Sequence, residues 1–417
     1  MPDKVDESYL LKDGDKFAQY RYKLTEFFII IDGETDELPI ERIVDMRISN
    51  YYEKAVFPLF KLGVVLEPIR YYKLLQNRDK VKFKIRIQSY YTTNDDPNNP
   101  SLLRDFINDT FVFFPDDDNI DMDVNLKDTD GLNELDQVNN YIELFLFRDI
   151  VTKLRSPVNY IFTGANMATV VSYLLYKAGV NKVLMSPFEN SKVYDQVICP
   201  PMGTEKQLRF LNNSFGFHKK GTMIFFGFIN TYILNCKDGC TAYAKKEWQE
   251  SKIFILDKTN TKSSLSGSFI RPEEEVFYTL IQSSAIDVKN SAPVENVLGG
   301  VNPTIVDMAA QSTSNNEADI TGVSTKNKKI LFNDSSNAFM GETQMALQKA
   351  NGTVIRAVIE NINIEAFKPN KKHSIVFEDS QMNSKFGGTY RIAESIFTFS
   401  HATGDFTLQA IVTFKKL

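Results

Sequence analysis

Apolar and polar residues alternate strictly between Lys80 and Gln88, where the sequence reads KVKFKIRIQ. Because successive side chains of a strand point to opposite faces, this segment predicts a strand with one buried and one wet face. Three earlier segments also have the aromatic and β-branched content of strands: Phe17–Ile31, Ile40–Ile48 and Val56–Leu66. Between the last of them and Lys80, Pro68–Asn77 predicts a turn followed by a short helix.

The pattern weakens after this strand. Thr93–Pro100 is dense in turn-forming residues and predicts a loop, and Leu102–Asn108 predicts a short helix. Phe111–Phe114 is a short apolar strand. Residues 1–123 are therefore expected to form a β-rich domain.

Helical periodicity appears in the middle of the chain. Met167–Ala178 carries an apolar stripe at helical spacing, and the following Gly179 is typical of a helix end. Thr204–Asn212 predicts a second helix. Thr222–Phe228 and Thr231–Leu234 are aromatic and β-branched, as strands tend to be. Residues 124–250 are therefore expected to form an α+β middle domain.

Strand patterns return in the last part, residues 251–417, and include two alternating strands at Thr389–Phe399 and Asp405–Phe414. Within this part, residues 290–337 are poor in aromatics and rich in Ser, Asn, Thr and Gly. This composition predicts a long loop or a flexible excursion. The fold class expected for the whole chain is β-rich α+β, with two β domains flanking an α/β middle domain.

Composition narrows the class of protein. Of 417 residues, 43% are hydrophobic and 24% charged, which is ordinary for a globular protein. A net charge of −5 argues against a general nucleic-acid binder, which needs a basic surface. The polar N-terminus does not resemble a signal peptide, and no apolar run is long enough for a membrane helix. Because the chain has only three cysteines, we expect it to fold in a reducing cytoplasm. We do not expect it to insert into a membrane.

Cysteine and histidine provide the first candidates for chemistry. Cys236 and Cys240 could start a zinc site, with Cys199 and His218 as further ligands, but the spacing of paired zinc ligands is absent. We interpret the two cysteines as flanking a tight turn. The other histidines, His373 and His401, also fall at predicted turns or strand edges, and no hydrolase or nucleotide-binding motif occurs. No catalytic, cofactor-binding or metal-binding residue is assigned, and no enzyme activity is expected.

Two further features have alternative interpretations. The acidic tract at residues 116–123 could hold calcium, could be a solvated loop, or could form a negative wall past which an anion slides. It lacks the spacing of an EF-hand. The single tryptophan, Trp248, is interpreted as an anchor in a core or at a domain junction.

Three segments together resemble the baseplate hub proteins of phage tails, in the late-control family of contractile-tailed phages. They are Tyr51–Tyr90; Tyr141–Trp248, which contains YDQVICPP, GFHKKG and TYIL; and Gly388–Phe414, which resembles the closing hairpin of the family. The resemblance implies two tube-like β domains, at residues 1–123 and 251–417, and a homotrimer. Three subunits would then offer six similar domains.

The resemblance also implies a structural role in the virion. The hub would join the sixfold tail tube to a threefold central spike or tail-tip protein, beside other baseplate proteins, after assembly in the host cytoplasm. The genome DNA would pass through its channel without specific binding, and an acidic wall would suit that passage. Two alternatives remain open: a tail-associated cell-wall hydrolase, and a receptor- or glycan-binding tail module.

Overall fold

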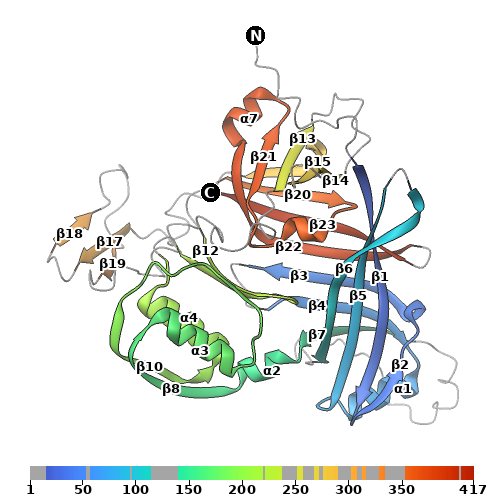
Figure 1. Cartoon of the computed structure of the whole chain (residues 1–417), viewed down its shortest axis with the longest axis horizontal. Helices are drawn as coiled ribbons and strands as arrows, with labels where there is room; N and C mark the ends of the chain where they lie inside the picture. Colours follow the sequence, from blue (N-terminus) through green and yellow to red (C-terminus); the bar gives the residue numbers. More distant parts are fainter. Residues whose placement is uncertain are drawn as a thin grey trace.

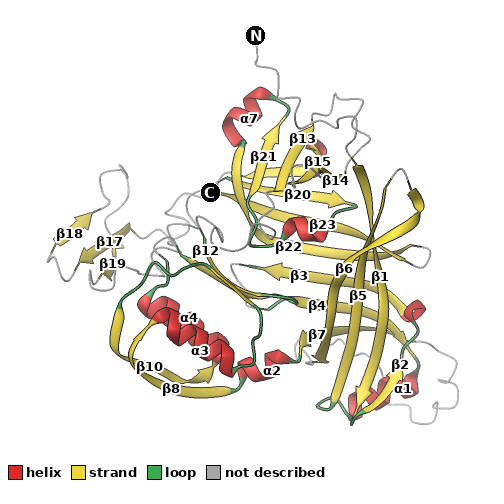
Figure 2. Cartoon of the chain, viewed as in Figure 1, coloured by secondary structure: helices red, strands yellow, loops and turns green. Residues whose placement is uncertain are grey.

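The computed structural model describes residues 16–52, 57–93, 96–113, 140–218, 221–236, 251–256, 267–271, 276–289, 302–307, 312–315, 328–333, 353–402 and 405–417. Strands dominate these residues, and short helices gather mainly in the middle of the chain (Figure 2). The expected β-rich α+β class is confirmed.

Eight strands pair in a closed circuit, in the order β22-β3-β4-β7-β6-β5-β1-β23, and β23 then pairs with β22 again (Figure 1). Their bounds are β1 Lys16–Ile31, β3 Ile43–Tyr51, β4 Leu59–Leu66, β5 Val81–Thr93, β6 Asp96–Phe113, β7 Asn140–Arg148, β22 Gly388–Ala402 and β23 Asp405–Lys416. Every neighbouring pair in this circuit is antiparallel. In a closed circuit every strand has a paired neighbour on both sides, so no sheet edge is free where the strands pair.

A second circuit continues from the same strands. It runs β14-β15-β13-β21-β22-β23-β1 and closes where Lys16 and Phe17 of β1 pair with β14. The added strands are β13 Ser251–Leu256, β14 Gly267–Arg271, β15 Val276–Gln282 and β21 His373–Phe377. β20 (Val354–Glu360) and β16 (Ile286–Lys289) extend the sheet from β23, and β2 (Glu34–Glu37) pairs with β1.

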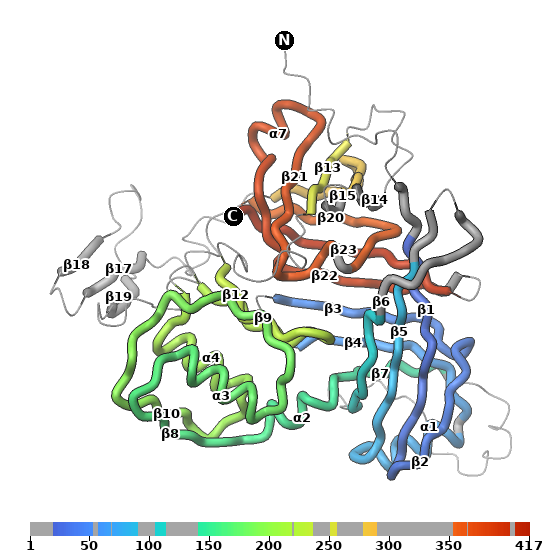
Figure 3. The backbone as a smooth tube through the Cα atoms, viewed as in Figure 1, coloured from blue at the N-terminus to red at the C-terminus, as the bar shows by residue number. Residues whose placement is uncertain are grey.

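The hairpin of β22 and β23 belongs to both circuits. The start of β22 pairs with β21, whereas its later part, residues 394–400, pairs with β3. β23 likewise meets β1 at Phe406 and β20 along residues 409–415. Figure 3 shows the consequence: the C-terminal hairpin lies beside the N-terminal strand β3.

The boundaries expected at residues 123 and 250 stay a prediction. β7, from the range assigned to the middle domain, and β22, from the range assigned to the last domain, both contribute to the first circuit.

Strict alternation along the strands creates the large core. On β23, Leu408, Ala410, Val412 and Phe414 are all buried, and the residues between them are exposed or half-buried. β5 has the same pattern, as its sequence predicts, with Phe83 stacked beside Phe27 at 6.0 Å between ring centroids. Aligned rings of this kind stabilise a core beyond the area they bury.

The middle part packs helices inside a curved ribbon. β8 (Pro157–Asn166) and β10 (Val193–Gly203) form the ribbon, with α3 (Met167–Lys177) and α4 (Thr204–Phe215) on its inner side (Figure 1). α2 (Ile150–Arg155) precedes β8. Both predicted helices are confirmed. At the start of α3, Asn166 Oδ1 accepts the amide of Thr169 at 2.9 Å, and Gly179 follows the helix with φ of 80°.

A three-stranded sheet joins the two cores. It consists of β11 (Thr222–Phe226), β12 (Thr231–Asn235) and β9 (Val183–Met185), and confirms both predicted strands. Phe225 and Tyr232 face the large core, whereas Phe226 and Ile233 face the core of the helices. Every residue of β11 and β12 is buried, because both faces of the sheet are covered.

Two local predictions are wrong. Leu102–Asn108 is not a helix and Asp96–Pro100 is not a loop, since both lie in β6, which pairs with β5 at Asp96 and again from Ser101 onwards. Pairing along a long neighbouring strand overrides local turn and helix preferences. By contrast, the helix expected at Pro68–Asn77 is confirmed as α1 (Pro68–Gln76).

Residues 290–337 contain a small sheet of β17 (Asn302–Asp307), β18 (Ser312–Asn315) and β19 (Lys328–Asn333), so they are not one long loop. The flexible excursion stays a prediction. The remaining elements are α7 (Ser380–Phe386) and three 3-10 turns at Ile40–Arg42, Ser283–Ala285 and Ile364–Phe367. In the described part of the chain, no helix combines the length and apolar character needed to span a membrane.

A charge on the buried face of the shared hairpin should prevent folding. Leu408 is 2% exposed, so Leu408→Asp would place a carboxylate among aliphatic and aromatic side chains. We expect loss of soluble protein or a loss of at least about 3 kcal/mol in the free energy of unfolding. Thr407→Asp, one position along on the exposed face, is the matched control and should change stability by less than about 0.5 kcal/mol. Equal thermal midpoints for the two variants, measured by circular dichroism, would contradict the assignment of the faces.

Candidate functional site

The two described histidine side chains are groups of the hydrophobic core. His218 packs edge-on against Phe188, with 5.4 Å between ring centroids, and burial lowers its pKa to about 4 despite the opposing charge of Glu189. His373 packs on Phe367 and Phe414, and burial together with Lys371 lowers its pKa to about 3. Neither ring of the two has a hydrogen-bond partner among the described residues.

Among the described residues, neither of these histidine rings is hydrogen-bonded to a cysteine. Cys199 lies on β10 and is buried, and burial raises the pKa of its thiol to about 11. A buried thiol of this kind is a poor nucleophile. Cys236 follows β12 and is half-buried. The structure therefore does not bring Cys199, His218 and His373 together as a catalytic group.

Several candidates lie outside the described residues: Cys240, Trp248 and the acidic tract at residues 116–123. His401 lies at the end of β22, and its side chain is also outside the description. Elsewhere in the described chain, no group of three or more His, Cys, Asp or Glu side chains could hold a metal ion.

Acid should destabilise the fold through the buried histidines. Each is neutral in the folded protein, with a pKa below the ordinary value of 6.5, so the unfolded chain binds protons first as the pH falls. Their stabilisation is complete above about pH 6.5 and is lost as the pH falls from there towards 4. His373→Leu should show a smaller drop in thermal midpoint between pH 7 and pH 4.5 than the wild type. Identical drops in the two proteins would show that His373 does not control this sensitivity.

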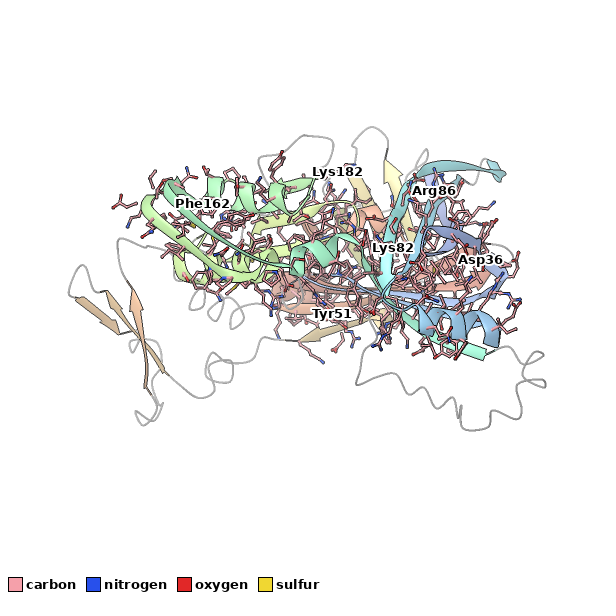
Figure 4. The ribbon with its side chains drawn as sticks, turned by 90° about the horizontal axis from the view of Figure 1, so that it is seen from below. Asp36, Tyr51, Lys82, Arg86, Phe162 and Lys182 are labelled. Atoms are coloured by element: carbon pink, nitrogen blue, oxygen red, sulfur yellow. The ribbon has the colours of Figure 1, made fainter. Side chains whose placement is uncertain are left out.

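On the outer face of β5, charged side chains link three strands. Arg86 donates two hydrogen bonds to Asp105 of β6, both at 3.2 Å, and one to Glu26 of β1 at 3.0 Å. Gln88 also donates to Asp105, and with Arg86 holds the pKa of that carboxyl below its usual range. Lys82 and Arg86 both lie on this strand (Figure 4). Because Arg86 and Lys82 are paired with carboxylates of neighbouring residues, we interpret this face as structural.

Arg148, the last residue of β7, connects the large sheet to the middle part. Its Nε lies 2.5 Å from Asp109 Oδ2 of β6, and its Nη1 donates to the carbonyl oxygen of Gly227 at 2.7 Å. Gly227 is in the turn between β11 and β12. In the same turn, Phe228 packs edge-on or tilted against Phe60 and Phe111 of the large core. A charged clamp and an aromatic contact therefore hold the same turn.

A cleft of about 660 Å³ lies beside this clamp, between the large sheet and the middle part. Asp105, Asn108 and Asp109 line one wall. The opposite side is lined by the loop at residues 179–182 and the β11–β12 turn, with Lys182 on the loop.

The outer face of the β8–β10 ribbon carries an exposed apolar pair. Ile161 and Ile198 are directly opposite each other in the antiparallel register. They are 65% and 55% exposed, so this contact is not part of the core. The sequence analysis did not single out either residue, although alternation along the two strands could have placed both on the outer face.

Removing the Arg148 guanidinium, which bridges Asp109 and the Gly227 carbonyl oxygen, should weaken the contact between the large sheet and the middle part. Arg148→Met would leave Asp109 and the Gly227 carbonyl without their charged donor, and we expect a loss of about 2 kcal/mol in the free energy of unfolding. The control is Lys82→Met, which breaks the exposed ion pair with Asp149 and should cost less than about 1 kcal/mol. Thermal unfolding and limited proteolysis of both variants check this, and equal effects would show that the clamp contributes no more than a surface pair.

Comparison with solved structures yields two tail proteins and a PdpA–VgrG complex, all at low sequence identity. A tail protein from Neisseria meningitidis MC58 is 9% identical, with a TM-score of 0.49 and coverage of 94% of this chain and 96% of that chain. The 43 kDa tail protein of prophage MuSo2 from Shewanella oneidensis is 11% identical, with a TM-score of 0.45 and coverage of 93% and 96%. The half-lidded PdpA–VgrG complex of Francisella is 9% identical, with a TM-score of 0.46 and coverage of 96% and 58%.

No curated protein sequence matches the chain. A family profile described as bacteriophage PBS1 gene 109 protein matches residues 6–417, almost the whole sequence. The resemblance to a family of phage proteins that the sequence indicates is confirmed. The chain belongs to the family of the bacteriophage PBS1 gene 109 protein.

Proposed function

We propose that this phage-tail-like structural protein is a baseplate hub that joins a sixfold tail tube to a threefold central spike. The observation that supports this role best is the pair of closed strand circuits that share the β22–β23 hairpin. One chain thereby offers two tube-like units. Three chains around an axis would offer six, which matches a sixfold tube above and a threefold spike below.

The proposed assembly is a homotrimer in the virion tail, in contact with the tail tube protein, the spike or tail-tip protein and other baseplate proteins. The genome would pass through the central channel without sequence-specific contacts. The net charge of −5 supports this, because a wall of the same sign as the phosphates limits adhesion. The buried histidines and Cys199 support a structural role, since none is placed for proton transfer or nucleophilic attack.

The symmetry provides the test. The full-length chain should have the mass of a trimer in native mass spectrometry, and averaged electron micrographs should show a ring with six similar lobes. A dimer with twofold symmetry, or three lobes in place of six, would contradict the hub.

A cell-wall digestion assay distinguishes the hub from the alternative role as a cell-wall hydrolase. The purified protein should release no soluble fragments from host cell walls above the level of a heat-denatured sample, with lysozyme as the positive control. Release that is lost in Cys199→Ala or in His218→Gln would instead identify an enzyme.

A further inference from the structure

Strand β6 changes partners along its length. On one edge it pairs with β5 from one end almost to the other. On the other edge it pairs with β7 only through Phe111, Val112 and Phe113. The Asp149 amide then donates to the Thr110 carbonyl oxygen at 2.8 Å, where β7 has ended at Arg148 and the chain enters α2. From Asp105 to Asp109, no described strand pairs with this second edge.

The cleft of about 660 Å³ runs along this unpaired edge. Asn108 and Asp109 both line it, although their side chains point to opposite faces of the sheet. Asn108 accepts a hydrogen bond from Lys84 on the outer face, whereas Asp109 binds Arg148 beside the β11–β12 turn. Successive residues of a strand reach the same space only when that space borders the strand's edge.

The acidic side chains that line the cleft are paired with cations, whereas two of its basic side chains have no acidic partner among the described residues. Each of its three aspartates already has a cation: Asp105 binds Arg86, Asp109 binds Arg148, and Asp149 binds Lys82. The remaining lining cations are Lys153 of α2 and Lys182 of the loop before β9, and neither has an acidic partner among the described residues. Among the described residues, the charge that stays uncompensated in the cleft is therefore positive.

The cleft also offers apolar contacts. Phe228 and Ile229, in the turn after β11, are half-buried and line it, whereas Phe226, which also lines it, is buried in the core. Phe228 packs against Phe106 and Phe111 of β6. The Arg148 clamp fixes this turn through Gly227, so the wall is in place before any partner arrives. A preformed wall reduces the ordering cost of binding.

We propose that this cleft binds an extended, acidic segment of a partner protein, which adds to β6 as a further strand. Backbone hydrogen bonds along Asp105–Asp109 would supply affinity, and carboxylates facing Lys153 and Lys182 would supply selectivity. Five residues of strand span about 17 Å, and the cleft volume lies within the usual range for binding sites. The proposal does not depend on the hub role.

The test uses fluorescein-labelled heptapeptides and the full-length chain. The first peptide alternates valine with polar residues and carries two glutamates: Thr-Val-Glu-Val-Glu-Val-Thr. In the second, proline replaces the central valine and removes a backbone donor. In the third, lysines replace the glutamates. We expect the first alone to bind in fluorescence polarisation, and to slow amide hydrogen exchange at residues 105–109.

Protein variants separate the site from general charge attraction. The double variant Lys153→Glu with Lys182→Glu should weaken binding of the first peptide at least tenfold and leave the thermal midpoint unchanged. Lys177→Glu, on the exposed side of α3 and outside the cleft, should bind as the wild type does. The proposal is overturned if the first peptide does not bind, if the proline peptide binds equally well, or if binding leaves exchange at residues 105–109 unchanged.

Discussion

The β22–β23 hairpin is the constraint on which the architecture depends. It pairs within itself along twelve registered positions while its outer edges serve two different sets of strands. A bulge between Ile392 and Glu394 lies where β22 changes its outer partner from β21 to β3. Bulges increase local twist and bend a strand, which suits a strand that must serve two circuits.

Side-chain hydrogen bonds reinforce the contact between β1 and this hairpin. β1 pairs with β23 only at Tyr22 and Phe406. The Tyr22 hydroxyl donates to the carbonyl oxygen of Ile362 at 2.9 Å and accepts the amide of Ile364 at 3.1 Å. Asn361 Oδ1 accepts the Tyr20 amide at 2.7 Å. The loop after β20 therefore joins β1 to the hairpin where strand pairing is short, and the buried Tyr22 hydroxyl is paired both as donor and as acceptor.

The middle part is fixed to this frame by a sheet with two apolar faces. Tyr52 packs edge-on against Phe225 at 4.6 Å between centroids, and its hydroxyl lies 2.9 Å from Ser395 Oγ of β22. β11, β3 and the shared hairpin therefore meet at one buried point. A load applied to the middle part would pass into both circuits through such contacts.

Local patterns in the sequence determined the elements with strong periodicity. The alternation of β5 and of β23, the stripe of α3 with Gly179 after it, and the apolar runs of β11 and β12 each follow from side-chain direction in a helix or strand. The same reasoning failed at Leu102–Asn108, because β5 imposes an extended conformation there that no local signal indicates. Only the tertiary structure decided that residues 388–416 complete circuits begun near residue 16, since pairing over such separations depends on which edges remain free after folding. The cleft beside β6 is also visible only in the tertiary structure, because its lining comes from elements far apart in the chain.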